Sequence, residues 1–378
     1  MFTRYNLKNY NFLLLFFTLA QAVYGISIIG SAKESVQNRQ IQGLILGLVV
    51  MTVVSFIDYS FILRFYWVYY FVCIALLVSV KLFGRSVNNA KRWLMIGGFQ
   101  FQPSEAAKIL LILFFAEFIM KNREKINKPS ILLYSVMLIA VPWYLIQDEP
   151  DLSTSLVILV VFAAMLYVGG LSSKIIFGFL AIAVPALVIT MFLILQPDQE
   201  IIKPYQQLRI LAWLQPDKYT NTEGYQQQNS ITAIGSGKLM GKGYKNNEVG
   251  SVKNGNFISE PQTDFIIAVA GEELGFVGCT AIVAIFAILT VIVIRTGMRA
   301  PDLAGTLLCA GVAAHIGFQS FANIGVATGL LPNTGLPLPF ISYGSTSLVC
   351  IMAEIGLVQN VGLSVVTEKR MQGLELDF

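Results

Sequence analysis

The sequence predicts an all-α polytopic integral membrane protein, organised as a single membrane domain over residues 1–378. Hydrophobic residues make up 55% of the chain, only 13% of the residues are charged, and the mean hydropathy is +0.67. Soluble domains carry about 25% charged residues, so this chain lacks the polar side chains that a water-exposed surface needs. The second observation is a succession of apolar runs, each about 20 residues long, which is the length that crosses a bilayer as a helix.

About ten such runs predict ten transmembrane helices. The first follows two basic residues and resembles a signal peptide, but its apolar part is too long for one. The fourth contains Glu105, Lys108 and Glu117, which are costly in a membrane and therefore need partners. The ten runs lie at roughly 10–30, 41–57, 65–82, 104–121, 131–147, 152–170, 174–195, 265–294, 303–326 and 344–366.

The distribution of basic residues predicts that both termini lie in the cytoplasm. In this orientation the inner segments contain more Lys and Arg than the short outer loops, as the positive-inside rule requires. One large segment, about 196–263, then lies outside, and its apolar pieces predict short amphipathic helices. Its glycines at 235–243 follow no buried strand, so we interpret them as turns rather than as a nucleotide-binding loop.

Cysteine and histidine are too few to predict a metal cluster or a disulfide scaffold. The four cysteines lie in apolar runs without ligand spacing. The single histidine, His315, falls in the ninth predicted helix, where we expect a hydrogen-bonded packing residue. A Ser-His-Asp triad is therefore disfavoured.

Two aspartates stand at the outer ends of predicted helices. Asp264 precedes the eighth helix and Asp151 precedes the sixth. Aspartate at a helix start commonly accepts backbone N–H bonds as an N-cap. Ionisable groups at the mouth of a membrane bundle also tend to line cavities or pathways, so both interpretations remain open.

Basic residues at the outer face form a second group. Arg92 and Lys91 belong to a cluster at 81–92 that lies outside, against the charge bias of the rest of the chain. They either anchor the membrane interface or bind an anion. Lys108 lies three residues after Glu105 on the same helix face, which is typical of a neutralising pair.

The segment 329–340 cannot form a continuous helix, because three prolines and two glycines interrupt it. A broken backbone at a membrane face is tolerated where it lines a cavity or is buried in protein. The segment is also more apolar than a bare connecting loop needs to be.

Residues 332–344 read PNTGLPLPFISYG and resemble the signature of the SEDS family (shape, elongation, division and sporulation). The Pro-x-Thr-Gly form at 332–335 is similar to the elongation branch rather than the division branch. Ser153 and Ser345 depart from the pattern, since glycine is usual at both positions. Further motifs follow the family order along nearly the whole chain: NAKRW at 89–93, QPSEAAK at 102–108, PDL at 150–152, GSG and GKG within 235–243, and TDF at 263–265.

The resemblance implies a peptidoglycan glycosyltransferase that polymerises lipid II on the outer face of the bacterial cytoplasmic membrane. It also implies a class B penicillin-binding protein as the partner, and no nucleic acid. A lipid II flippase and a non-catalytic scaffold are the alternatives. The nearly uninterrupted apolar inner halves of the helices favour the polymerase over the flippase. Small residues that could contact the partner's helix are Ala281, Ala284, Ala287, Gly305 and Gly311.

The implied reaction assigns roles to these residues. A sugar hydroxyl displaces undecaprenyl diphosphate, which requires a base for its proton and compensation for the charge on the leaving group. Asp264 is the expected base, because the loops contain no histidine. A divalent cation held by Asp264, Glu105 or Asp151 is compatible with this chemistry but not required by it. The substrate-binding candidates are Arg92, Lys91, Lys108, Glu105, Asp151, Ser342 and Thr334.

Overall fold

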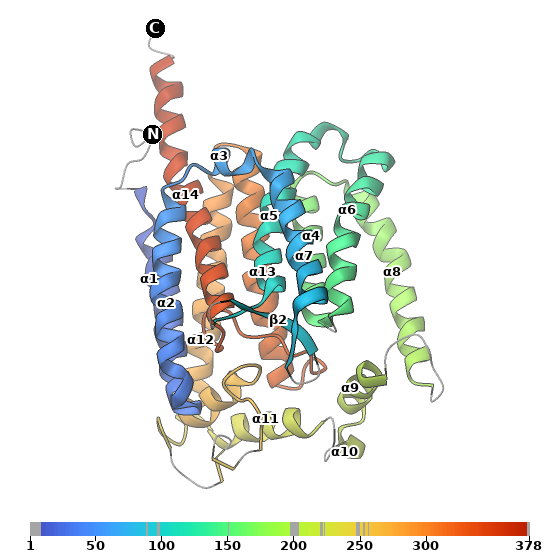
Figure 1. Ribbon diagram of the computed structural model, residues 1–378, viewed down its shortest axis with the longest axis vertical. Helices are drawn as coiled ribbons and strands as arrows, with labels where there is room; N and C mark the ends of the chain where they lie inside the picture. Colours follow the sequence, from blue (N-terminus) through green and yellow to red (C-terminus); the bar gives the residue numbers. More distant parts are fainter. Residues whose placement is uncertain are drawn as a thin grey trace.

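The computed structural model describes residues 9–87, 90–96, 99–149, 151–196, 204–219, 222, 224–246, 250–251, 254–255 and 257–375. Within these residues, a helix lies at each of the ten predicted spans (Figure 1). Eight of these helices are long and apolar enough to cross a membrane by themselves. The other two are α5, which carries charges near both ends, and α7, which has 17 residues. The ten helices are α1 (Phe12–Ala32), α2 (Glu34–Ser55), α4 (Tyr66–Phe83), α5 (Pro103–Lys121), α6 (Pro129–Asp148), α7 (Leu152–Val168), α8 (Ser173–Ile194), α12 (Ile266–Met298), α13 (Leu303–Ala327) and α14 (Ser345–Glu375).

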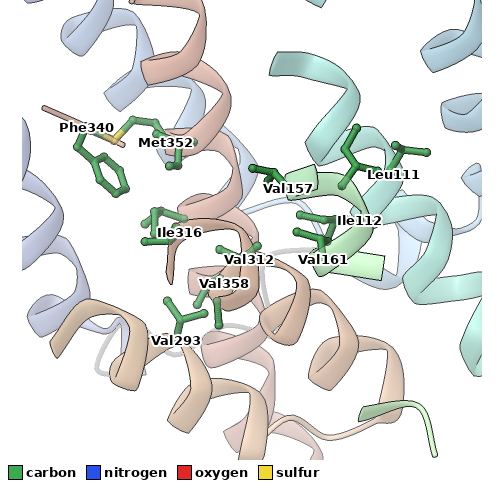
Figure 2. Close-up of a cluster of buried hydrophobic side chains, with 14 of the residues drawn as sticks. Leu111, Ile112, Val157, Val161, Val293, Val312, Ile316, Phe340, Met352 and Val358 are labelled. Carbon is green, nitrogen blue, oxygen red and sulfur yellow. The ribbon is translucent and has the colours of Figure 1, made fainter. Parts of the chain in front are cut away.

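The helix α5 forms the centre of the bundle, and most of its side chains are buried. It packs against α4, α7, α13 and α14. At the opposite extreme, α8 lies at the edge of the bundle, and no described side chain between 173 and 193 is buried (Figure 1). Its apolar surface suits contact with lipid, which solvates such side chains as well as a protein core does. The core joins α5, α7, α12, α13 and α14 through residues that include Leu111, Ile112, Val157, Val161, Val293, Val312, Ile316 and Val358 (Figure 2).

A small antiparallel sheet between α4 and α5 was not predicted from the sequence. It consists of β1 (Arg85–Val87), β2 (Ala90–Ile96) and β3 (Phe99–Phe101), with β2 in the middle. Arg85 pairs with Trp93, and Leu94 pairs with Phe101. The sheet connects α4 to α5 and carries Arg85, Lys91 and Arg92 of the basic cluster.

The outer segment forms the expected short helices: α9 (Pro204–Leu214), α10 (Pro216–Tyr219) and α11 (Tyr225–Ser236). The Ser230 hydroxyl of α11 donates to the Ala327 carbonyl at 2.8 Å, which ties the segment to the end of α13. Its glycines do more than turn the chain. A Cβ on Gly237 would lie 1.9 Å from the Gly271 carbonyl oxygen, so the segment packs backbone to backbone on α12. There α12 is kinked at Gly275, whose φ of 65° favours glycine.

The segment between α13 and α14 is irregular, as predicted. Gly329 and Gly335 have φ angles of 79° and 75°, and Phe340 adopts a φ of 62°. At the opposite end of the bundle lie α3 (Tyr59–Leu63) and the 3-10 turn η3 (Arg123–Lys125). The helix α1 begins and α14 ends at that same end, whereas α9, α10, α11 and β2 lie at the other (Figure 1). The bundle therefore has one end that carries the termini and one that carries the candidate site.

Candidate active site

Asp264 lies one residue outside the N-cap of α12. The cap position is Phe265, and it makes no side-chain capping hydrogen bond. Asp264 is therefore not the N-cap of α12, and its carboxylate makes no capping hydrogen bond among the described residues. Its backbone carbonyl is fixed instead, because the Asn323 side-chain amide donates to it at 2.8 Å and to the Leu336 carbonyl at 2.6 Å. One buried asparagine thus joins Asp264 to the irregular segment.

The irregular segment approaches the Asp264 carboxylate through a glycine. A Cβ on Gly335 would lie 3.4 Å from Asp264 Oδ2. Ser342 holds the same segment in place: its hydroxyl donates to the Thr263 carbonyl at 2.5 Å and accepts from the Leu338 N–H at 2.8 Å. Ser342 was predicted to bind substrate, but in this structure both contacts of its hydroxyl are internal. The sequence signature at 332–344 therefore shapes the wall beside Asp264.

Thr334 contributes a different feature. Its carbonyl accepts a hydrogen bond from the Ser153 hydroxyl of α7. Its own hydroxyl is buried and has no hydrogen-bond partner among the described residues. Thr334 thus remains a candidate for substrate binding, because its Oγ1 is unused.

Four charged side chains act on Asp264. Burial raises the pKa of Asp264 above its ordinary value, Arg92 and Arg209 lower it, and Asp151 and Glu260 raise it again. The net direction is upward, because removing a carboxylate from water disfavours its charged form. A carboxylate whose pKa is raised is a stronger base than an ordinary one.

Two arginines reach this site from separate elements. Arg92 lies in β2, and its Nε donates to the Glu149 carbonyl at 3.1 Å. Arg209 lies in α9, and its Nη1 donates to the Asn333 carbonyl at 3.4 Å. The sequence predicted Arg92 but missed Arg209, because basic residues in a long outer loop carry no orientation signal. The backbone of Lys91 pairs with Ser86 in the sheet, and its side chain lies outside the described residues.

Asp151 serves as a helix cap. Its Oδ1 accepts from the Thr154 N–H at 3.1 Å, and its Oδ2 accepts from the Thr154 hydroxyl at 2.9 Å. Both oxygens are therefore engaged at the start of α7. Asp151 acts on the site through its charge, which helps to raise the pKa of Asp264.

Glu105 and Lys108 form a buried ion pair in the first turns of α5, with 2.8 Å between Nζ and Oε1. Lys108 also donates to the Gln319 Oε1 at 2.8 Å, and the Gln319 amide donates to the Pro337 carbonyl at 2.9 Å. His315 lies 2.9 Å from the same Gln319 oxygen, in agreement with its predicted packing role. The recorded contacts of Lys108 are thus internal and support the irregular segment.

The sequence left open whether a divalent cation takes part in the reaction. In the described residues no group of three or more His, Cys, Asp and Glu side chains could hold a metal ion. Of the three proposed carboxylates, Asp151 caps α7 and Glu105 pairs with Lys108. A cation at this site would therefore depend on Asp264 and on the phosphates of a ligand.

Comparison with known proteins agrees with the geometry. The family model for FtsW, RodA and SpoVE, described as "cell cycle protein", matches residues 3–366. The peptidoglycan glycosyltransferase MrdB of Escherichia coli K12 is 34% identical, over 92% of each chain. The probable peptidoglycan glycosyltransferase FtsW of Geobacter sulfurreducens is also 34% identical, over 94% of this chain and 95% of that one.

Two solved structures share the fold. A chain of a peptidoglycan synthase complex superposes with a TM-score of 0.76 and 28% identity, over 96% of this chain and 99% of that one. RodA of Thermus thermophilus superposes with a TM-score of 0.68 and 27% identity, over 93% and 96%. The chain therefore belongs to the FtsW, RodA and SpoVE family, the SEDS proteins.

Proposed function

We propose that this protein is a peptidoglycan glycosyltransferase that polymerises lipid II on the outer face of the cytoplasmic membrane. The observation that carries the proposal is a carboxylate, Asp264, that is not the N-cap of α12 and whose pKa the charges of Arg92 and Arg209 lower. The names of its relatives MrdB and FtsW support the same reaction. The Pro-x-Thr-Gly form at 332–335 favours a role in cell elongation.

Asp264 is proposed as the general base. It takes the proton of the acceptor sugar hydroxyl as that oxygen forms a bond to the anomeric carbon of the donor, whose bond to the diphosphate oxygen breaks. A raised pKa suits this task, because proton transfer is most effective when the pKa of the base approaches the working pH. An α-linked donor becomes a β-linked product, so a single inverting displacement needs no covalent enzyme intermediate.

The leaving diphosphate needs positive charge. Arg92 and Arg209 are proposed to supply it, since a guanidinium matches phosphate oxygens with two parallel hydrogen bonds. Lys91 precedes Arg92 in β2 and stays a proposed substrate-binding residue on the evidence of the sequence alone. Lys108 is assigned to helix packing instead, because its ammonium already contacts Glu105 and Gln319.

A penicillin-binding protein of class B is the proposed partner. One of the related structures belongs to a complex described as coordinating polymerization and crosslinking, which supports this choice. Among the small residues considered as contacts, Gly305 and Gly311 are buried, and a Cβ on Gly311 would lie 2.9 Å from Ile112. Ala281, Ala284 and Ala287 are exposed along α12 and remain the candidates.

The test is an assay of the purified protein, alone and with its partner, on labelled lipid II, with glycan chains resolved on a gel. Asp264→Asn should reduce polymerisation by about 10²–10⁴-fold, the usual cost of losing a general base. Its melting temperature should stay near that of the wild type, because no helix cap is lost. Asp217→Asn, on the exposed surface of α10 at the same end, is the matched control and should retain activity. Near wild-type polymerisation by Asp264→Asn would refute the mechanism.

A further inference from the structure

Glu149 is a buried carboxyl group beside the site that the proposed mechanism does not use. It follows α6 directly and is 6% exposed. Both of its carboxyl oxygens are closed to solvent, and neither has a hydrogen-bond partner among the described residues. An ionised carboxylate in such a place is strongly disfavoured, because nothing replaces the water that it has lost.

The charges around Glu149 come from four elements. Arg92 of β2 contacts its backbone carbonyl, but not its carboxyl oxygens. Asp148, at the end of α6, pairs with Lys81 of α4 at 2.8 Å. Asp151 caps α7. Burial raises the pKa of Glu149 to about 8, and Asp151 and Asp148 act in the same direction while Arg92 opposes them. The neutral form of Glu149 is therefore favoured at pH 7.

Arg92 links this carboxyl group to Asp264, since its charge acts on both. An ionised Glu149 would neutralise part of the charge of Arg92, whereas a neutral Glu149 leaves that charge to an anion in the site. We propose that Glu149 is a positioning residue which, as a neutral carboxylic acid, keeps the charge of Arg92 directed at the diphosphate of the lipid-linked donor. The inference rests on the proposed function and adds a second protonation requirement to the same site.

The consequence is a coupling between donor binding and one proton. When the pH is below the pKa of Glu149, the donor diphosphate binds beside a neutral Glu149 and a positively charged Arg92. Above it, the donor meets an additional negative charge, and Arg92 is drawn toward Glu149. Binding that requires one proton on the protein weakens about tenfold for each pH unit above the pKa of the group. The effect should therefore appear in KM for lipid II more than in kcat.

The test measures KM and kcat for lipid II with the protein in complex with its partner, from about pH 6.5 to about pH 9.5. The wild-type KM should rise above about pH 8, approaching tenfold per pH unit. Glu149→Gln has the same shape but cannot ionise, so it should polymerise lipid II at pH 7 with a KM that stays level to pH 9. Glu124→Gln, exposed in η3 at the other end of the bundle, should keep the wild-type profile.

A second experiment measures the affinity of the protein for undecaprenyl diphosphate in detergent, at pH 7 and at pH 9. Wild-type affinity should fall at pH 9, and that of Glu149→Gln should not. If both proteins show the same rise of KM and the same loss of affinity, the inference is wrong. Inactivity of folded Glu149→Gln at pH 7 would also overturn it. A wild type that never polymerises lipid II would instead contradict the proposed function. The affinity for undecaprenyl diphosphate at pH 7 and pH 9 would still test the role of Glu149.

Discussion

At the scale of single residues, Asp264 predicts the acid side of the pH profile. A general base acts only when it is ionised, and burial raises the pKa of Asp264 above its ordinary value of 3.8. We expect kcat/KM for lipid II to fall as the pH decreases through a value above the ordinary range of aspartate. The measurement is the pH dependence of kcat/KM for the wild-type complex. Full activity down to about pH 4 would contradict a raised pKa at the base.

The residues that sequence reasoning found and those it missed differ in one respect. Asp264 directly precedes an apolar run, and Arg92 belongs to a basic cluster that opposes the charge bias, so both stand out in the sequence. Arg209 lies in a long polar segment, and Glu149 stands between Asp148 and Asp151 in a short acidic connection, so the sequence does not distinguish either from its neighbours. Their importance comes from burial and from proximity to Asp264 and Arg92, which only the packed structure provides.

At the scale of elements, the irregular segment between α13 and α14 predicts a sharp difference between two glycines. Gly335→Ala forces a methyl group onto a residue with a φ of 75° and places it 3.4 Å from Asp264 Oδ2. We expect a cost of about 1 kcal/mol in stability and a loss of activity, because the backbone must shift beside the base. Gly344→Ala is the control, since its new Cβ would meet Ser347 at an ordinary 3.7 Å. The measurements are lipid II turnover and melting temperature of both variants. If Gly335→Ala and Gly344→Ala lose the same activity and stability, the irregular segment does not position Asp264.

The ion pair in α5 makes a second prediction at this scale. Exchanging its charges, Glu105→Lys with Lys108→Glu, places a carboxylate against the Gln319 oxygen that now accepts from Lys108. Turning the Gln319 amide over would relieve this clash but would remove its hydrogen bond to the Pro337 carbonyl. We expect a loss of about 1.5–3 kcal/mol in stability, the usual contribution of a buried hydrogen bond to a charged group. Lipid II turnover should fall as well, because the segment at Pro337 loses its support.

The matched control exchanges Glu117 and Lys121, an ion pair of the same helix with a half-exposed lysine and a spacing of 3.1 Å. Glu117 is buried but Lys121 is half-exposed, and the pair lies at the end of α5 away from Asp264, so this variant should retain activity. Full activity of the Glu105 and Lys108 exchange would show that pairing within α5 is all that these residues require.

Length and apolarity predicted the helices well, because a lipid-spanning segment must satisfy its own backbone hydrogen bonds. The ends were less predictable: α2 begins at Glu34 and α12 extends to Met298, both beyond the apolar runs. The sheet was missed because two of its strands have only three residues, too few to show an alternating pattern. The short strands β1 and β3 are stabilised by pairing with β2, and this pairing depends on how the chain folds rather than on local sequence.

At the scale of the whole molecule, the charge bias predicts that the end with the site faces outward. We expect a single cysteine at position 218 to react with an impermeant reagent in intact spheroplasts, and one at position 125 to react only after lysis. Lys218 lies in the exposed helix α10 and Lys125 in the exposed turn η3, so both positions are accessible on their own side. The native cysteines Cys73, Cys279, Cys309 and Cys350 are replaced beforehand. The reverse labelling pattern would place Asp264 in the cytoplasm, where an extracellular polymerase could not use it.

The buried contact between Lys108 and Gln319 also constrains how the protein is made. The helix α5 enters the membrane while α13, some two hundred residues later in the chain, has yet to be synthesised. A charge at the centre of a helix opposes insertion by about 2.5–3.5 kcal/mol. Lys108 lies in the first turns of α5, where the cost is smaller, and Glu105 relieves part of it. Stable insertion of α5 should therefore wait until α13 arrives with Gln319. A nascent chain that ends before α13 would hold its central helix loosely, which makes this helix the point at which membrane quality control could distinguish finished from unfinished protein.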